Sequence, residues 1–117
     1  MGTAPRMPGS KKMVLKYVDF LYSSTISVPM YPGSTGSYSV SVASKLPLDI
    51  CKKLTIENIC CLNNFSFSSQ YAPKDNYFIV NITSYDPSSG VFAFYLQSTY
   101  GCDARNIPFR VYYIGEP

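Results

Sequence analysis

The sequence predicts an all-β fold, an antiparallel β-sandwich formed by one domain. Short runs in which apolar and polar residues alternate recur along the chain, and this period of two is typical of half-buried strands. Turn segments rich in Pro, Gly, Asn and Asp separate the runs. No stretch shows a convincing helical period, and a length of 117 residues suits one domain. We therefore expect a sandwich of about seven or eight short strands.

The first half of the domain contains three expected strands and a turn. Residues 13–22 alternate between two faces. Residues 24–30 form a strand that either lies at an edge or ends at Pro29, because proline cannot donate to the ladder. Residues 31–36 have the composition of a turn. Residues 37–44 (SYSVSVAS) show the cleanest period of two. The two faces of the first strand are Val14, Lys16, Val18 and Phe20 against Leu15, Tyr17, Asp19 and Leu21.

The second half begins with an ambiguous segment and continues with strands. Residues 50–62 fit either period, so we expect a strand over 53–62 and allow one helical turn near 49–53. Asp86–Gly90 is a hairpin loop, in which proline presets φ and glycine can take a positive φ. Residues 100–106 are expected to form a loop. The remaining strands are expected at residues 63–68, 77–83, 91–99 and 109–115.

Basic residues are concentrated at the N-terminus, which we expect to be an extended arm (residues 1–12) outside the domain (residues 13–117). The chain has ten basic and seven acidic residues, and four of the basic ones precede Asp19, the first acid. The arm is either a solvated terminus or a contact with a neighbouring subunit. The rest of the chain is nearly neutral, and the lack of a basic stripe argues against nucleic acid as a partner. The basic residues before Asp19 are Arg6, Lys11, Lys12 and Lys16.

The composition excludes several classes of enzyme. No histidine is present, so Ser–His–Asp and Cys–His nucleophile systems and histidine-ligated metal sites are excluded. The seven acids are scattered, and no glycine-rich phosphate-binding loop occurs. We therefore expect no enzyme activity and no cofactor.

The four cysteines, Cys51, Cys60, Cys61 and Cys102, show no CxxC spacing that would indicate a zinc site. Cys60 and Cys61 are adjacent, so on a strand they face opposite sides. We expect the cysteines to be small buried hydrophobic residues. A disulfide that involves Cys102 stays open.

Two groups of residues are candidates for contacts with other molecules. The chain has eleven tyrosines, a residue type enriched at recognition surfaces but also favoured in strands. Tyr112 and Tyr113 are adjacent, so one of them points away from the core and is a candidate assembly contact, together with the basic arm. The expected loop is a candidate receptor or partner contact, or else a surface loop with a local ion pair. Its candidate residues are Tyr100, Asp103, Arg105 and Asn106.

The N-terminal residues contain no apolar signal-peptide core, and no apolar run approaches the ~20 residues of a membrane helix. We expect a protein that is made in the cytoplasm of a host and does not enter a membrane.

The C-terminal part, residues 77–115, resembles a known family. The order YFIVNIT, DPSSG, VFAFYLQST, a loop and FRVYYIG is similar to the end of small β-sandwich domains in bacteriophage tail fibres and related H-type lectin-like modules. Those domains also finish with a hairpin around a glycine and an aromatic-rich strand that ends in Ile-Gly, although the family's usual tryptophan in that strand is absent here. The resemblance implies a jelly-roll or lectin-like sandwich from a phage particle.

These observations favour a non-enzymatic structural component of a virus particle, a bacteriophage by resemblance, such as a tail, fibre or capsid-associated protein. Its expected partners are other copies of itself and other virion proteins, and its expected location is the virion. The alternative is a receptor- or glycan-binding module of a tail fibre, which contacts a host-surface glycan or receptor.

Overall fold

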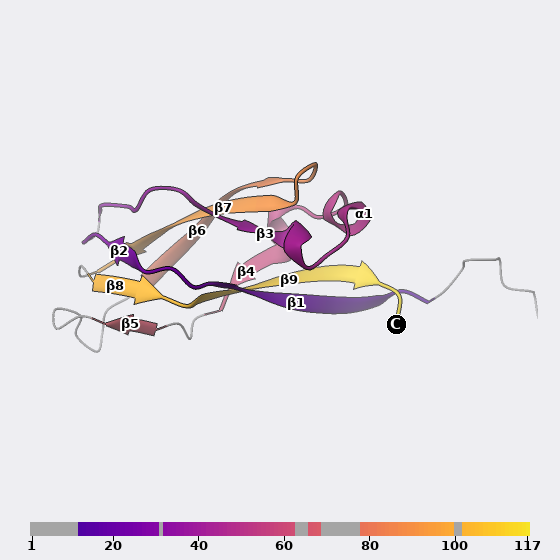
Figure 1. Cartoon of the computed structure of the whole chain (residues 1–117), viewed down its shortest axis with the longest axis horizontal. Coiled ribbons are helices and arrows are strands. Elements are labelled where there is room, and N and C mark those ends of the chain that lie inside the picture. Colours follow the sequence, from indigo (N-terminus) through magenta and orange to yellow (C-terminus); the bar gives the residue numbers. More distant parts are fainter. Residues whose placement is uncertain (1–11, 31, 63–65, 69–77, 100–101) are drawn as a thin grey trace, which may run out of the picture.

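The protein is an all-β antiparallel sandwich, which confirms the predicted fold class. The structure, a computed structural model, describes residues 12–30, 32–62, 66–68, 78–99 and 102–117. Nine strands lie in these residues (Figure 1): β1 (Val14–Tyr22), β2 (Ile26–Val28), β3 (Tyr38–Ser41), β4 (Ile59–Cys61), β5 (Ser66–Ser68), β6 (Phe78–Asp86), β7 (Val91–Ser98), β8 (Cys102–Arg105) and β9 (Ile107–Gly115). The described helical turns are η1 (Val42–Ser44), α1 (Leu48–Cys51) and η2 (Ile56–Asn58).

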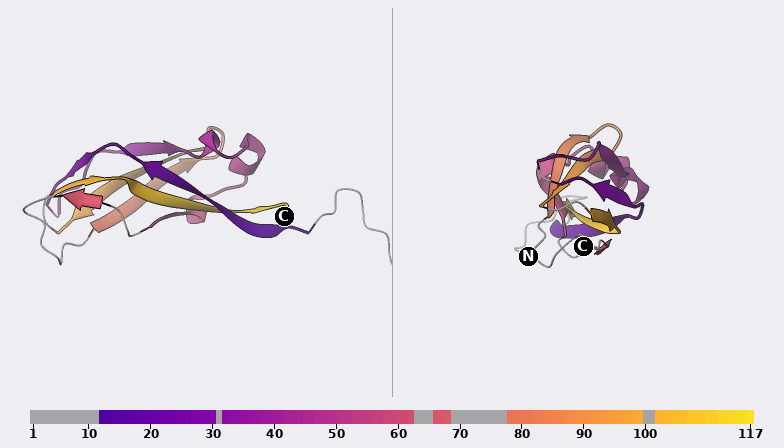
Figure 2. Two further views of the ribbon diagram at one scale, coloured as in Figure 1. Left: turned by 60° about the horizontal axis from the view of Figure 1, so that its bottom comes forward. Right: turned by 90° about the vertical axis from the view of Figure 1, so that its left-hand side faces the viewer.

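The strands form two layers. Two three-stranded sheets, in the orders β1-β9-β4 and β2-β8-β5, continue one another, because only residues 23–25 separate β1 from β2 and only Asn106 separates β8 from β9. The third sheet, in the order β3-β7-β6, faces this long layer (Figure 2). If each continued pair is counted as one strand, the nine strands become seven, which agrees with the expected number.

A single left-handed residue keeps one side of the long layer buried. Asn106 has a φ of 56°, a conformation that asparagine tolerates better than most residues. Cys102 and Ala104 are buried before it, and Ile107 and Phe109 are buried after it. The extra residue thus shifts the alternation by one position, as a β-bulge does, and the same face of the layer stays toward the core.

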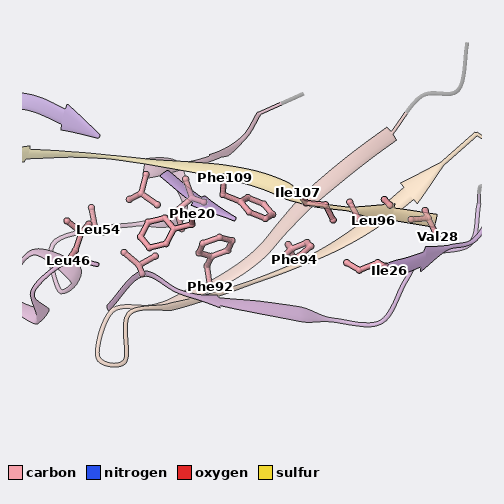
Figure 3. Packing of buried hydrophobic residues seen from close by; sticks show 14 of the residues in the cluster. Phe20, Ile26, Val28, Leu46, Leu54, Phe92, Phe94, Leu96, Ile107 and Phe109 are labelled. Carbon is pink, nitrogen blue, oxygen red and sulfur yellow. The ribbon is translucent and has the colours of Figure 1, made fainter. Parts of the chain in front are cut away.

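The core lies between the two layers and is centred on three phenylalanines (Figure 3). Phe92 and Phe94 project from β7, Phe109 projects from β9, and all three are 0% exposed. The ring of Phe109 lies 5.0 Å from that of Phe92 and 4.7 Å from that of Phe94, measured between centroids. Since β7 and β9 are the central strands of their sheets, these rings join the middles of the two layers.

The β6–β7 hairpin is tied to the helical turns at one end of the sandwich. Gly90 has a φ of 69°, and its carbonyl oxygen accepts hydrogen bonds from the N–H groups of Val42 at 2.6 Å and Ala43 at 3.3 Å. The hydroxyl of Tyr85 donates to the carbonyl oxygen of Cys51 in α1 at 2.6 Å. Burial beside Cys51 raises the pKa of Tyr85 to about 12, so this donor keeps its proton at neutral pH. None of the helices in the described residues is long and apolar enough to cross a membrane.

The sequence predicted most strands, and the differences have local causes. The strand expected at 37–44 ends at Ser41, because the bonds to the Gly90 carbonyl curl residues 42–44 into η1. Of the strand expected over 53–62, only Ile59–Cys61 forms a paired strand (β4), and the allowed helical turn is α1. The expectation of a loop over 100–106 is wrong for Cys102–Arg105, which pair as β8 between β2 and β5.

Candidate assembly surface on β1 and β9

One side of the paired strands β1 and β9 points away from the core, and we call it the outer face. The antiparallel register places its residues in four rows across the two strands. The outward residues of β1 are at positions 15, 17, 19 and 21, and those of β9 are at positions 108, 110, 112 and 114. The rows are Leu15 with Ile114, Tyr17 with Tyr112, Asp19 with Arg110, and Leu21 with Pro108.

The outer face is apolar although it is exposed. Leu15 is 68% exposed, Leu21 and Ile114 are each 57% exposed, and Tyr17 is 55% exposed. An antiparallel sheet with one side in water normally carries polar residues on that side. Here six of the eight residues in the four rows are apolar or aromatic. Contiguous apolar surfaces are typical of contact sites, so the outer face is the candidate contact surface of this chain.

An ion pair between Asp19 and Arg110 lies in the middle of the outer face, so that the charged groups of this face bond to each other. The guanidinium of Arg110 donates two hydrogen bonds to the carboxylate of Asp19, from Nε at 2.7 Å and from Nη2 at 3.0 Å. This bonding lowers the pKa of Asp19 below its usual value and raises the pKa of Arg110. The two charges therefore persist at neutral pH and cancel, which leaves the face electrically neutral.

Aromatic contacts fix the orientation of the central side chains. The guanidinium carbon of Arg110 lies 3.9 Å from the centroid of the Tyr17 ring, a cation–π geometry. The Tyr17 and Tyr112 rings meet edge to face, with centroids 6.0 Å apart. Asp19, Arg110, Tyr17 and Tyr112 thus form one ordered group. Because these side chains are already ordered, binding of a partner to this group would cost little additional side-chain entropy.

The structure places the predicted contact residues in different parts of the fold. Tyr112 lies on the outer face, whereas Tyr113 is half-buried and packs against the core from the opposite side, as their adjacency predicted. Lys12 is exposed, two residues before β1. On β8, Asp103 and Arg105 are exposed, and Asn106 is the exposed bulge residue that follows. Arg6, Lys11 and Tyr100 lie outside the described residues.

Sequence reasoning missed Leu15, Tyr17 and Leu21 as contact residues. A signal was present, because residues 13–22 carry apolar side chains on both of their alternating faces. A strand with only one face in the core needs apolar residues on that face alone. The second apolar set therefore indicates a second contact.

The cysteines behave as small packing residues. All four are thiols; Cys51 and Cys102 are buried, and Cys60 and Cys61 are half-buried. Burial, with a smaller effect of Cys60, raises the pKa of Cys61 to about 12, so this thiol stays protonated and is a poor nucleophile at neutral pH. The described residues contain no group of three or more Cys, Asp or Glu side chains placed to hold a metal ion.

The fold is a β-sandwich, and its outer face is an exposed apolar surface with an ordered polar and aromatic centre. Comparison of the chain with protein-family models, with curated proteins and with solved structures found no significant match.

Proposed function

We propose that this chain is a non-enzymatic structural subunit of a virus particle, specifically of a bacteriophage. We further propose that it acts by binding neighbouring subunits through the outer face. The exposed apolar rows on β1 and β9 are the observation that carries this proposal. The proposed location is the virion, and the proposed partners are other copies of the chain and other virion proteins.

The physical properties of the outer face suit a permanent contact between subunits. Permanent protein interfaces are more apolar than the rest of a protein surface and are enriched in tyrosine and arginine at their centres. The outer face has leucine and isoleucine at its ends and tyrosine with a paired arginine in the middle. Covering it removes apolar side chains from water without leaving an unpaired charge.

The proposal is tested by measuring incorporation of the chain into particles. We expect mass spectrometry of purified particles to detect the chain at a fixed copy number. The double variant Leu15→Glu/Ile114→Glu is expected to reduce that copy number at least tenfold, because two carboxylates on the outer face must be desolvated in the contact. Both side chains are more than half exposed, so the variant should unfold at the temperature of the wild-type chain.

Leu48→Glu is the matched control, because Leu48 is 51% exposed but lies on α1, outside the outer face. It should be incorporated like the wild-type chain. Absence of the wild-type chain from particles would overturn the virion assignment. Normal incorporation of Leu15→Glu/Ile114→Glu would overturn the role of the outer face.

A further inference from the structure

We propose that the molecule covering the outer face is a second copy of this chain, packed face to face about a two-fold axis that runs nearly parallel to β1 and β9. This inference rests on the proposed role of the outer face in assembly. It adds the identity of the partner and the geometry of the contact.

The register of β1 and β9 makes the outer face complementary to itself. Three rows join two residues of the same kind or of opposite charge: aliphatic in Leu15 with Ile114, aromatic in Tyr17 with Tyr112, and charged in Asp19 with Arg110. The fourth row joins two apolar residues, Leu21 and Pro108. A two-fold axis along the strands, between β1 and β9, places β1 of one copy over β9 of the other. Each residue then faces, in the other copy, the same residue that it pairs with across β1 and β9 in its own copy; Leu15 of one copy faces Ile114 of the other.

The charges fit this arrangement as well. Asp19 of one copy lies over Arg110 of the other, and the same contact occurs a second time across the axis. Two carboxylates and two guanidinium groups then meet with alternating signs and without excess charge. A two-fold axis that lies in the plane of the contact, perpendicular to the strands and at the centre of the four rows, would instead place the charged row over the tyrosine row. Asp19 of one copy would then not face Arg110 of the other copy.

The geometry agrees with the way sheets pack. Sheets packed face to face lie ~10 Å apart, with strand directions that differ by about 30°. A two-fold axis tilted by about half of that angle from the strands generates this crossing. The paired strands are nine residues long, so they offer a contact of ~30 Å in length at ~3.3 Å per residue.

The edge of β1 that lies away from β9 is a poorer contact than the outer face. β1 is at the edge of its sheet, and an unpaired edge can accept a strand from another chain. The amine of Lys45, however, donates to the carbonyl oxygen of Asp19 at 2.5 Å. Lysine at an edge is a common device against strand addition, so this contact favours the face over the edge.

A charge-exchange experiment tests the proposal. Sedimentation equilibrium of the full chain from 1 µM to 1 mM, a range of about a thousandfold in which weak dimers are resolved, should show a monomer–dimer equilibrium. Asp19→Arg and Arg110→Asp should each raise the dimer dissociation constant at least tenfold, because like charges then face each other across the axis. An equimolar mixture of the two variants should form a heterodimer within about threefold of the wild-type dissociation constant, because 19 over 110 again pairs opposite charges.

Control variants separate this local pairing from attraction between net charges. Lys52→Glu and Glu57→Lys change the net charge by the same amounts at exposed positions outside the outer face. Each alone should dimerise like the wild-type chain, and mixing them should change nothing. Circular dichroism should show that all four variants are folded.

Three outcomes overturn the proposal. A wild-type chain that stays monomeric up to 1 mM, a concentration at which even a contact worth about 4 kcal/mol is half populated, excludes the second copy. If Asp19→Arg and Arg110→Asp leave the dimer dissociation constant unchanged, the contact lies elsewhere, such as at the edge of β1. Weakened variants that fail to recover on mixing exclude the axis along the strands. In the first case, reduced incorporation of Leu15→Glu/Ile114→Glu into particles would still support the outer face as a contact with a different virion protein.

Discussion

Replacing Phe109 with alanine is expected to lower the free energy of unfolding by about 3–5 kcal/mol, the usual cost of removing a buried phenylalanine side chain. Phe109 is 0% exposed, and its ring packs against those of both Phe92 and Phe94 from the other layer. The structure around a deleted core side chain relaxes only partly, so a cavity remains between the two layers. Since single domains are stable by about 5–15 kcal/mol, the loss is a large fraction of the total. Urea denaturation followed by circular dichroism measures it.

Ile114→Ala is the control for Phe109→Ala, because Ile114 lies on the same strand but points outward and is 57% exposed. Its free energy of unfolding should change by no more than about 0.5 kcal/mol under conditions in which the chain is monomeric. A loss below about 1 kcal/mol for Phe109→Ala, or equal losses for both variants, would mean that the two layers do not pack around this ring.

Replacing Gly90 with alanine is expected to lower the free energy of unfolding by about 2–5 kcal/mol. The φ of Gly90 is 69°, a left-handed conformation that costs a residue with a side chain about 1–2 kcal/mol. A Cβ atom at this position would lie 3.0 Å from both Ala43 Cβ and Cys51 Sγ. Overpacking of this kind adds about 1–3 kcal/mol. Thermal unfolding should show a clearly lowered midpoint, because the clash separates the β6–β7 hairpin from η1 and α1.

Gly36→Ala is the matched control for Gly90→Ala. A Cβ atom at Gly36 would meet no atom within 4 Å. This variant should be unchanged or more stable by up to about 1 kcal/mol, because alanine restricts the unfolded chain. If Gly90→Ala were as stable as Gly36→Ala, the left-handed turn and its hydrogen bonds to η1 would not exist in solution.

The sequence predicts the elements that contain long runs of strand-forming residues and misses those set by distant partners. β1, β7 and most of β9 are predicted, because each contains a run of seven or more residues rich in apolar and aromatic side chains. The sequence predicts a loop at β8 (Cys102–Arg105), because Asp, Ala and Arg carry a weak strand signal and its pairing with β2 and β5 depends on residues far away in the chain. The end of β3 at Ser41 depends on Gly90, which is also far away in the chain.

The candidate surface was predictable only in part. The adjacency of Tyr112 and Tyr113 was enough to show that one of them points outward, and the structure shows that it is Tyr112. The rows of the outer face require the register between β1 and β9, which joins residues more than eighty positions apart. A shift of one residue would send the opposite side chains outward. Pairwise register of this kind has no local signature in a single sequence.

Hydroxyl-radical footprinting of the chain, free at low concentration and assembled in particles, tests most directly whether the outer face is covered by another protein. Leu15, Tyr17 and Ile114, which are all more than half exposed in the free chain, should be oxidised at least fivefold more slowly in particles. Leu48 on α1, which is 51% exposed, provides the internal reference and should change much less. Equal oxidation rates for Leu15, Tyr17 and Ile114 in the free and assembled chain would contradict the account.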